Sequence, residues 1–197
     1  MKIDFPLPTD GKMHRYCFSC RKEGAIQVKD GATTRYFCNA CGKTNDRAIY
    51  FKDHVVWLDK NKELWHESSG VFVRNTDGKF LFFKRTEFPF ALTVPAGHVD
   101  VGESPEESAI RELKEETNIE GTLTHIGDAD IVGDSCSAAA DAHRWHTYLL
   151  KQTTNNNVRI LEEGEKALWL SLNEAKEIGL AYVIEQIVNK YRSQLQS

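Results

Sequence analysis

The segment from residue 97 to residue 119, GHVDVGESPEESAIRELKEETNI, carries seven carboxylates in 23 residues and yet has strong helix signals. Ser104 is a good N-cap, Pro105 suits the first helical position, and Glu107 completes an S-x-x-E capping box. We therefore expect a helix that begins after Ser104. The apolar residues expected to dock it are Ala109, Ile110 and Leu113.

Three of the carboxylates share one face of this helix, which we expect to lie on the side away from the apolar stripe. Glu112, Glu115 and Glu116 stand at i, i+3 and i+4, where side chains lie about 5–6 Å apart and like charges weaken a helix. A cation among them removes this cost. Mg²⁺ and Mn²⁺ take carboxylate oxygens together with phosphate oxygens and waters. The pattern therefore predicts a divalent metal site.

The spacing of these residues resembles the Nudix box, G-x5-E-x7-R-E-U-x-E-E-x-G-U, in which U is a bulky aliphatic residue. Asn118 stands where the family has Gly, and Asn is the other residue that tolerates a left-handed helix end. A solvated acidic helix is the alternative, but it requires no upstream Gly or Glu at fixed distances. Eight of the nine defined positions match, at Gly97, Glu103, Arg111, Glu112, Leu113, Glu115, Glu116 and Ile119.

The resemblance implies a hydrolase that cleaves the diphosphate linkage of a nucleoside diphosphate joined to another group X. It implies a Mg²⁺ or Mn²⁺ site to which Arg111 and Glu103 contribute by holding loop and helix in register. Glu115 or Glu116 would take the proton from the attacking water, with Glu163 as a later-loop alternative beside Glu162 and Glu165. The residues assigned to the metal site are Gly97 (through its carbonyl), Glu103, Glu112, Glu115 and Glu116.

Near the N-terminus, Cys17 and Cys20 form one C-x2-C pair, and Cys38 and Cys41 form another, with 17 residues between the two pairs. This spacing is typical of a four-thiolate structural Zn²⁺ site. Between the pairs, AIQVKDGATTRYF predicts a β-hairpin that turns at Asp30-Gly31. The arrangement resembles a zinc ribbon. Two disulfides or a redox C-x2-C are the alternatives, and the N-terminus shows no signal peptide that would favour disulfides.

The chain is predicted to hold two modules. Residues 1–50 would form the zinc ribbon, residues 51–65 a connector or edge hairpin, and residues 66–197 the Nudix domain. Alternating strands joined by turn residues precede and follow the acidic helix, and two helical patterns close the chain. The fold class expected from the resemblance is α/β (α+β), a mixed β-sheet sandwiched between helices. Helical spacing predicts a core-facing stripe of Ile184, Ile187, Val188 and Tyr191.

The identity of X stays open. A ribbon ahead of a Nudix domain resembles the NADH pyrophosphatase arrangement, which favours an NADH- or ADP-ribose-like substrate. The chain lacks the S-Q-P-W-P-F-P-x-S motif of that subfamily, and it has no proline after Pro105, where ADP-ribose hydrolases tend to have one. Two other hypotheses are a module that binds nucleotide or RNA without turnover, and an adaptor whose ribbon docks a partner.

The composition of the chain indicates which kinds of partner it could bind. Residues 1–50 carry nine Lys or Arg against five Asp or Glu, and this small basic excess gives only weak support to nucleic-acid binding. No run of 18 apolar residues occurs, so we expect no membrane span. We expect a cytoplasmic protein that acts on a nucleotide-derived small molecule, and the sequence leaves a homodimer open.

The fifth cysteine, Cys136, lies in GDSCSAAADAH, a small-residue stretch that predicts a loop. We expect a free thiol there. Asp134, Ser135 and His143 are candidates to face the substrate pocket, with a surface connection as the alternative. Alternation predicts a strand over HRWHTYLL, and we assign neither His143 nor His146 to a metal.

Overall fold

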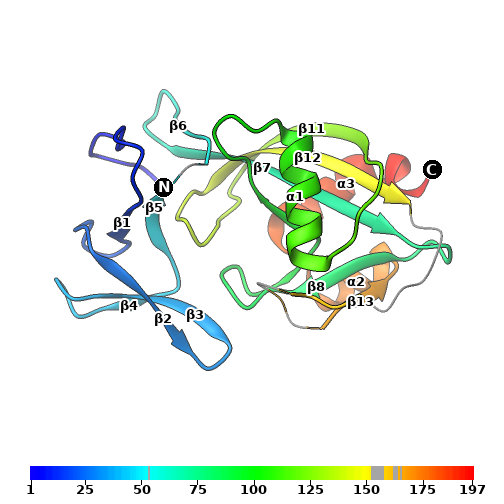
Figure 1. The fold of residues 1–197 in the computed structure, drawn as a ribbon, viewed down its shortest axis with the longest axis horizontal. Helices are drawn as coiled ribbons and strands as arrows, with labels where there is room; N and C mark the ends of the chain where they lie inside the picture. The colour runs from blue at the N-terminus through cyan, green and yellow to red at the C-terminus, as the bar shows by residue number, and fades with distance from the viewer. Residues whose placement is uncertain (53, 152–157, 162–163, 165) are drawn as a thin grey trace.

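The computed structural model of the protein contains a small group of N-terminal strands beside a larger α/β unit (Figure 1). Three helices and thirteen strands are assigned among the described residues. The structure describes residues 1–52, 54–151, 158–161, 164 and 166–197.

The N-terminal strands form two small sheets. Strands β2 (Ala25–Asp30), β3 (Thr33–Cys38) and β4 (Thr44–Asn45) make an antiparallel sheet of three. Strand β1 (His14–Cys17) pairs with β5 (Ala48–Phe51). The predicted hairpin between the two cysteine pairs is confirmed, since Asp30 pairs with Thr33 across the turn.

The larger unit is built on a mixed sheet of eight strands. Its central strand, β7 (Leu64–Arg74), pairs in parallel with β12 (Ala142–Lys151), which also pairs with β11 (Thr124–Val132). Every other pairing is antiparallel. The remaining strands are β6 (Val56–Leu58) and β10 (Ala96–His98), which pair with β7, and β8 (Phe80–Lys84), β9 (Leu92–Thr93) and β13 (Leu168–Leu170).

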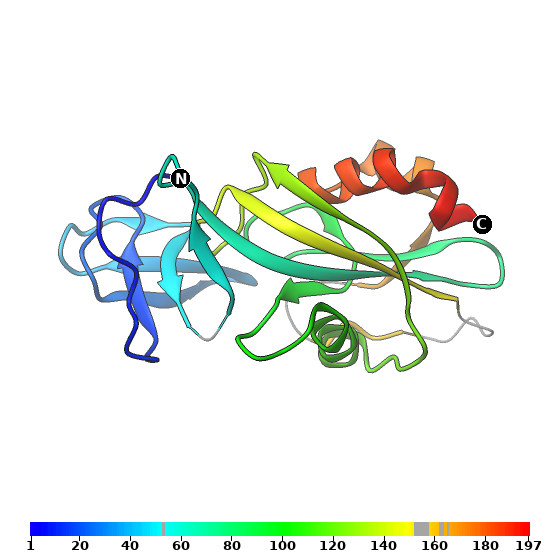
Figure 2. The ribbon, with the colours of Figure 1, turned by 90° about the horizontal axis from the view of Figure 1, so that it is seen from above.

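Helices cover both faces of this sheet. Helix α1 (Pro105–Thr117) lies on one face, and α2 (Leu172–Ile178) and α3 (Tyr182–Gln196) lie on the other (Figure 2). Each face carries its own apolar core, because β7 and β8 are buried on both sides. The predicted class, a mixed sheet between helices, is confirmed. The predicted stripe on α3 is confirmed as well, with Ile184, Ile187, Val188 and Tyr191 all buried.

Helix α1 begins and ends as its sequence predicts. The Ser104 side chain accepts from the backbone N–H of Glu107, and Glu107 bonds back to the backbone of Ser104. Asn118 ends the helix in the left-handed conformation, with φ 55° and ψ 24°. The residue that replaces the expected glycine therefore keeps the expected backbone.

The docking stripe of α1 differs from the prediction. Ala109 and Leu113 are fully buried, but the Ile110 side chain is 44% exposed. The buried line continues instead to Glu116, which is 3% exposed. The prediction was wrong at Ile110 because its side chain points about 100° away from that of Ala109 around the helix.

A third apolar cluster joins the N-terminal strands to the larger sheet. Its buried members come from the segment before β1, from β5, from the start of β7 and from the loop after β11, and they are Ile3, Ile49, Phe51, Leu64, Ala139 and Ala140. The boundaries at residues 50 and 65 stay predictions. None of the helices in the described part of the chain is both long enough and apolar enough to cross a membrane.

Candidate functional site

Strand β10 brings the backbone of Gly97 against the acidic face of α1. A β-carbon at this position would overlap the carboxylate of Glu112. Any larger residue here would force the Glu112 carboxylate to move, so glycine lets the backbone and this carboxylate lie side by side. Gly97 also pairs with Ser69 of β7, and this pairing fixes the start of the loop between β10 and α1 relative to the sheet.

Arg111 ties the loop before α1 to the acidic residues of the helix. Its Nε and Nη2 atoms donate to the two carboxylate oxygens of Glu103, at 2.9 and 3.0 Å. Its Nη1 atom donates to Glu112 at 2.6 Å and to Glu115 at 3.3 Å. Nη2 also donates to the backbone carbonyl of His98 at 3.2 Å.

This arrangement shifts the titration of both partners. The hydrogen bonds from Arg111 hold the pKa of Glu103 below its usual value of 4.5, in spite of partial burial. The hydrogen bonds to Glu103, together with the charge of Glu112, raise the pKa of Arg111. One guanidinium thus partly neutralises three carboxylates and fixes their positions.

The three glutamates of the acidic face differ in exposure. The Glu115 side chain is 49% exposed, that of Glu112 is 16% exposed, and Glu116 is buried. Glu116 Oε2 accepts from the backbone N–H of Ala96 at 2.9 Å, which offsets part of the cost of burying a carboxylate. The expectation that all three lie opposite the docking face was wrong for Glu116.

The acidic face borders a pocket of about 290 Å³. The pocket wall contains all three glutamates, Gly97 and Arg111, so the structure brings these predicted residues together. Asp134, Ser135 and His143, predicted as pocket candidates, also line it. Lys52 and Arg85 bring cationic side chains to the same wall, and the sequence pattern gave no sign of them.

Glu163 cannot be placed relative to this pocket. It lies outside the described residues, as do Glu162 and Glu165. Gly164, between them, forms a β-bridge with the pocket residue Arg85. The assignment of Glu163 as an alternative base stays a prediction.

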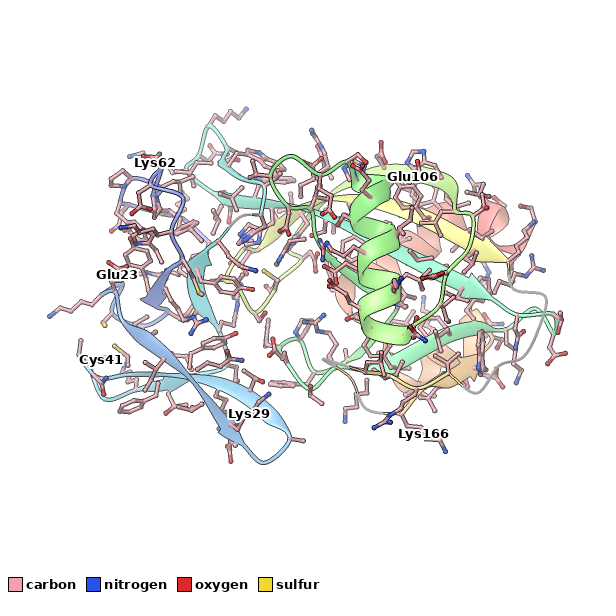
Figure 3. The ribbon with its side chains drawn as sticks, viewed as in Figure 1. Glu23, Lys29, Cys41, Lys62, Glu106 and Lys166 are labelled. Carbon is pink, nitrogen blue, oxygen red and sulfur yellow. The ribbon has the colours of Figure 1, made fainter. Side chains whose placement is uncertain are left out.

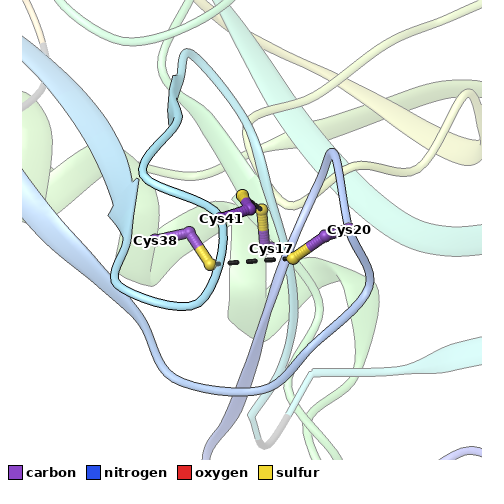
Figure 4. A group of neighbouring side chains, drawn as sticks. All are labelled: Cys17, Cys20, Cys38 and Cys41. Carbon is purple, nitrogen blue, oxygen red and sulfur yellow. Dashed lines mark hydrogen bonds between the residues drawn. The ribbon is translucent and has the colours of Figure 1, made fainter.

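The four cysteines of the two C-x2-C pairs converge at one point. Their sulfur atoms all lie within 4.8 Å of one another, and Figure 4 shows the four side chains pointing together. The Cys17–Cys41 and Cys20–Cys38 sulfur distances are both 3.7 Å, so neither pair is a disulfide. Burial raises the pKa of Cys38, but the backbone N–H groups of Cys41 and Ala40 and the thiols of Cys17 and Cys20 together outweigh burial and hold that pKa at about 7.

The cysteine cluster and the acidic face lie in different parts of the molecule. The N-terminal strands carry the labelled Cys41, whereas α1 carries the labelled Glu106 (Figure 3). Thiolates suit Zn²⁺, and carboxylates suit Mg²⁺ or Mn²⁺. The two donor sets therefore favour different metals.

Sequence reasoning missed a second cluster of metal-ligating side chains. Ligand atoms of His66, His98, Cys136 and His143 lie within 4.8 Å of one another. The parallel pairing of β12 with β7 sets His143 directly beside His66. The pairing of β10 with β7 brings His98 to the same place, so a prediction of the strand order was needed to find this cluster.

A comparison with protein families matches residues 64–191 to the NUDIX domain. Among curated proteins, the asymmetrical bis(5'-nucleosyl)-tetraphosphatase of Mus musculus is 31% identical over 106 residues, covering 53% of this chain and 71% of the relative. The RNA pyrophosphohydrolase of Sphingopyxis alaskensis is 39% identical over 70 residues, covering 35% of this chain and 44% of the relative.

Solved structures share the fold of the larger unit. The NUDIX domain of Shewanella oneidensis NrtR, complexed with ADP ribose, superposes with a TM-score of 0.57 at 18% identity, covering 66% of this chain and 88% of that one. A Caenorhabditis elegans Ap4A hydrolase in a binary complex gives a TM-score of 0.51 at 25% identity, covering 65% and 97%. The chain spans only 35% and 44% of the first two curated relatives.

Proposed function

This chain belongs to the NUDIX domain family, and on that premise we propose that it is a metal-dependent hydrolase. The bond it cleaves is a phosphoanhydride in a nucleoside diphosphate linked to another group X. The single observation that carries the proposal is the joining of Gly97, Arg111 and the three glutamates of α1 at the wall of one pocket.

The donor set fits a hard divalent cation. Glu112 and Glu115 approach the same nitrogen of Arg111 from two sides, and Glu116 is held beside the Gly97 backbone through Ala96. Carboxylate oxygens of Glu112, Glu115 and Glu116 and the Gly97 carbonyl would hold Mg²⁺ or Mn²⁺. Such an ion neutralises phosphate oxygens and lowers the pKa of a bound water.

The chain itself supplies positioning and proton transfer. Arg111 and Glu103 hold the loop against the helix, so that the backbone at Gly97 stays beside Glu112. Glu115 is the more exposed glutamate, and Glu116 is fixed by its bond to the Ala96 N–H, so either is a base for the attacking water. Lys52 and Arg85 give the pocket wall the positive charge that a diphosphate requires.

The relatives support a nucleotide as substrate and leave X open. Their printed names include a dinucleoside tetraphosphatase, an RNA pyrophosphohydrolase and an ADP-ribose pyrophosphatase. All of these substrates contain a nucleoside joined to a phosphate chain. We propose a substrate of that class, NADH- or ADP-ribose-like or another nucleotide derivative.

The cysteine cluster is proposed as a structural zinc site. Tetrahedral Zn²⁺ with Zn–S bonds of about 2.3 Å places sulfurs about 3.8 Å apart. The observed 3.7 Å separations agree with that geometry. Cys17, Cys20, Cys38 and Cys41 would close the site, and the ion would hold β1 to the β2–β3 hairpin.

A substrate panel tests the hydrolase. The protein would be incubated with NADH, ADP-ribose, diadenosine polyphosphates and nucleoside triphosphates in Mg²⁺ or Mn²⁺, beside Glu116→Gln and Glu106→Gln. Glu116→Gln should abolish turnover, and Glu106→Gln, a first-turn glutamate outside the pocket wall, should not. Binding without turnover of any member would favour a nucleotide-binding module instead. Turnover that survives Glu116→Gln would remove the site assignment.

Metal analysis tests the cysteine site. Cys38→Ser should lose one zinc per chain relative to the wild-type protein, whereas Ser19→Ala, between the cysteines of the other C-x2-C pair, should lose none. Equal zinc in Cys38→Ser and the wild type would contradict the proposal.

A further inference from the structure

A second group of soft ligands lies between the sheet and the loop that follows β11. His66 comes from β7, His98 from β10, His143 from β12, and Cys136 from the loop. Nδ1 of His66 lies 3.1 Å from Nε2 of His98 and 3.7 Å from the Cys136 sulfur. His98, Cys136 and His143 also line the pocket, but neither of the two metal sites proposed above takes a ligand from any of these side chains.

Hydrogen bonding alone does not explain this cluster. His66 Nδ1 carries at most one proton, yet it faces both the His98 nitrogen and the Cys136 sulfur. His66 Nε2 is buried and has no hydrogen-bond partner among the described residues. The His66 ring is fully buried and packs against the rings of His54, His98 and His143, with centroid distances of 4.7, 4.6 and 5.5 Å.

The spacing of the ligand atoms matches a tetrahedral metal centre. With Zn–N bonds of about 2.0–2.1 Å and a Zn–S bond of about 2.3 Å, a tetrahedron places two nitrogens about 3.3 Å apart and a nitrogen and a sulfur about 3.6 Å apart. The observed 3.1 Å and 3.7 Å separations lie within about 0.2 Å of these values.

An acidic residue already supports one of the ligands. Asp134 Oδ2 lies 2.9 Å from Nδ1 of His143, and the two residues are only 5% and 2% exposed. A metal-bound histidine usually donates its second ring N–H to a carboxylate, which orients the ring and fixes the tautomer. Asp134 therefore leaves Nε2 of His143 as the ligand atom.

The charges balance when a divalent ion is added. When Zn²⁺ takes the place of the Nε2 proton of His143 and of the thiol proton of Cys136, three neutral imidazoles, one thiolate, the Asp134 carboxylate and the ion would sum to zero, which suits a buried position. Magnesium does not suit this donor set, since it prefers oxygen ligands, whereas zinc takes nitrogen and sulfur.

We propose that His66, His98, Cys136 and His143 bind one Zn²⁺ ion, as a structural site separate from the four-cysteine cluster. Four protein ligands close the tetrahedron and leave no position for substrate. The ion holds the loop containing Cys136 against β7, β10 and β12. Because His98 follows Gly97 directly, it also fixes the strand that presents the Gly97 backbone to Glu112.

Zinc stoichiometry tests the proposal. After removal of loosely bound metal, the wild-type protein should retain two zinc ions per chain, and Cys136→Ser and His66→Asn should each retain one. His125→Asn is the matched control, since it alters an exposed histidine of a different His/Asp group, and it should retain two. One zinc in the wild type and in Cys136→Ser alike would overturn the proposal.

X-ray absorption at the zinc edge of the wild-type protein provides a test that does not require folded variants. Two sites together predict five sulfur and three nitrogen ligands, whereas the cysteine cluster alone predicts sulfur only. A shell of sulfur without nitrogen would refute the second site. Hydrolase activity enters neither measurement, so failure of this proposal is distinct from failure of the proposed function.

Discussion

The backbone of Gly97 lies so close to the Glu112 carboxylate that a methyl group at position 97 would overlap it. The first residue of the Nudix box therefore leaves room for an acidic side chain, in addition to the metal ligand that its backbone carbonyl is proposed to supply. Gly97 and Glu112 are 15 residues apart in the sequence, and the fold places them side by side.

Gly97→Ala should therefore weaken metal binding. The added methyl group displaces Glu112, and we expect Mn²⁺ affinity to fall ~10-fold or more. Calorimetric titration with Mn²⁺ measures this. Gly121→Ala is the control, because its methyl group would meet the Leu150 side chain away from the pocket and should reduce stability only. Equal Mn²⁺ affinity in both variants would contradict this account.

Glu103→Gln should change how stability depends on pH. The folded-state pKa of Glu103 is lowered by Arg111, so its ion pair stabilises the fold above the unfolded pKa near 4.5 and is lost as pH falls through the folded value. We expect the free energy of unfolding at pH 7 to be about 2 kcal/mol larger for the wild type than for Glu103→Gln, because hydrogen bonds to a charged group contribute about that much. Urea unfolding from pH 7 to pH 3 should show the two converging at the acid end. A constant difference would be inconsistent with this pairing.

The docking face of α1 is tested by two leucine-sized residues on one helix. Leu113→Ala should destabilise the protein by about 2–5 kcal/mol, because it leaves a cavity in a fully buried position. Ile110→Ala, at a 44% exposed position, should change stability by no more than about 0.5 kcal/mol. Denaturant midpoints give both values, and a larger loss in Ile110→Ala would place the docking face where the sequence alone put it.

The left-handed end of α1 makes Asn118 replaceable by glycine. Asn118→Gly should match or slightly exceed the wild type in stability, whereas Asn118→Ala should lose about 1 kcal/mol, because alanine has no local hydrogen bond to offset its left-handed strain. Thermal unfolding of the three proteins measures the order. Alanine equal to asparagine would show that the strain is absent.

Local signals predicted much of the fold. The capping box at Ser104, the hairpin at Asp30-Gly31 and the apolar spacing of α3 each involve neighbours in sequence, where sterics and periodicity are decisive. The spacing of the box likewise predicted which residues of α1 gather at the pocket wall. Glu116 was misplaced because its burial depends on the Ala96 N–H, which only the packed fold brings to it.

The histidine cluster shows where prediction from local pattern ends. His66 and His143 are 77 positions apart, and the parallel pairing of β7 with β12 brings them together. No turn motif or residue spacing in the sequence predicts that pairing. Lys52 and Arg85 reach the pocket for the same reason, from segments before and after β7. Long-range register, rather than residue type, decides these contacts.

Arg47 donates to the backbone carbonyls of Cys136 and Ala140 and to the Asp141 carboxylate, so the N-terminal strands grip the same loop that walls the pocket. The backbone N–H of Ala48 adds a bond to the Ser137 carbonyl. Without residues 1–50, the loop that lines the pocket would lose these four hydrogen bonds. The N-terminal strands therefore help to hold one wall of the pocket in place.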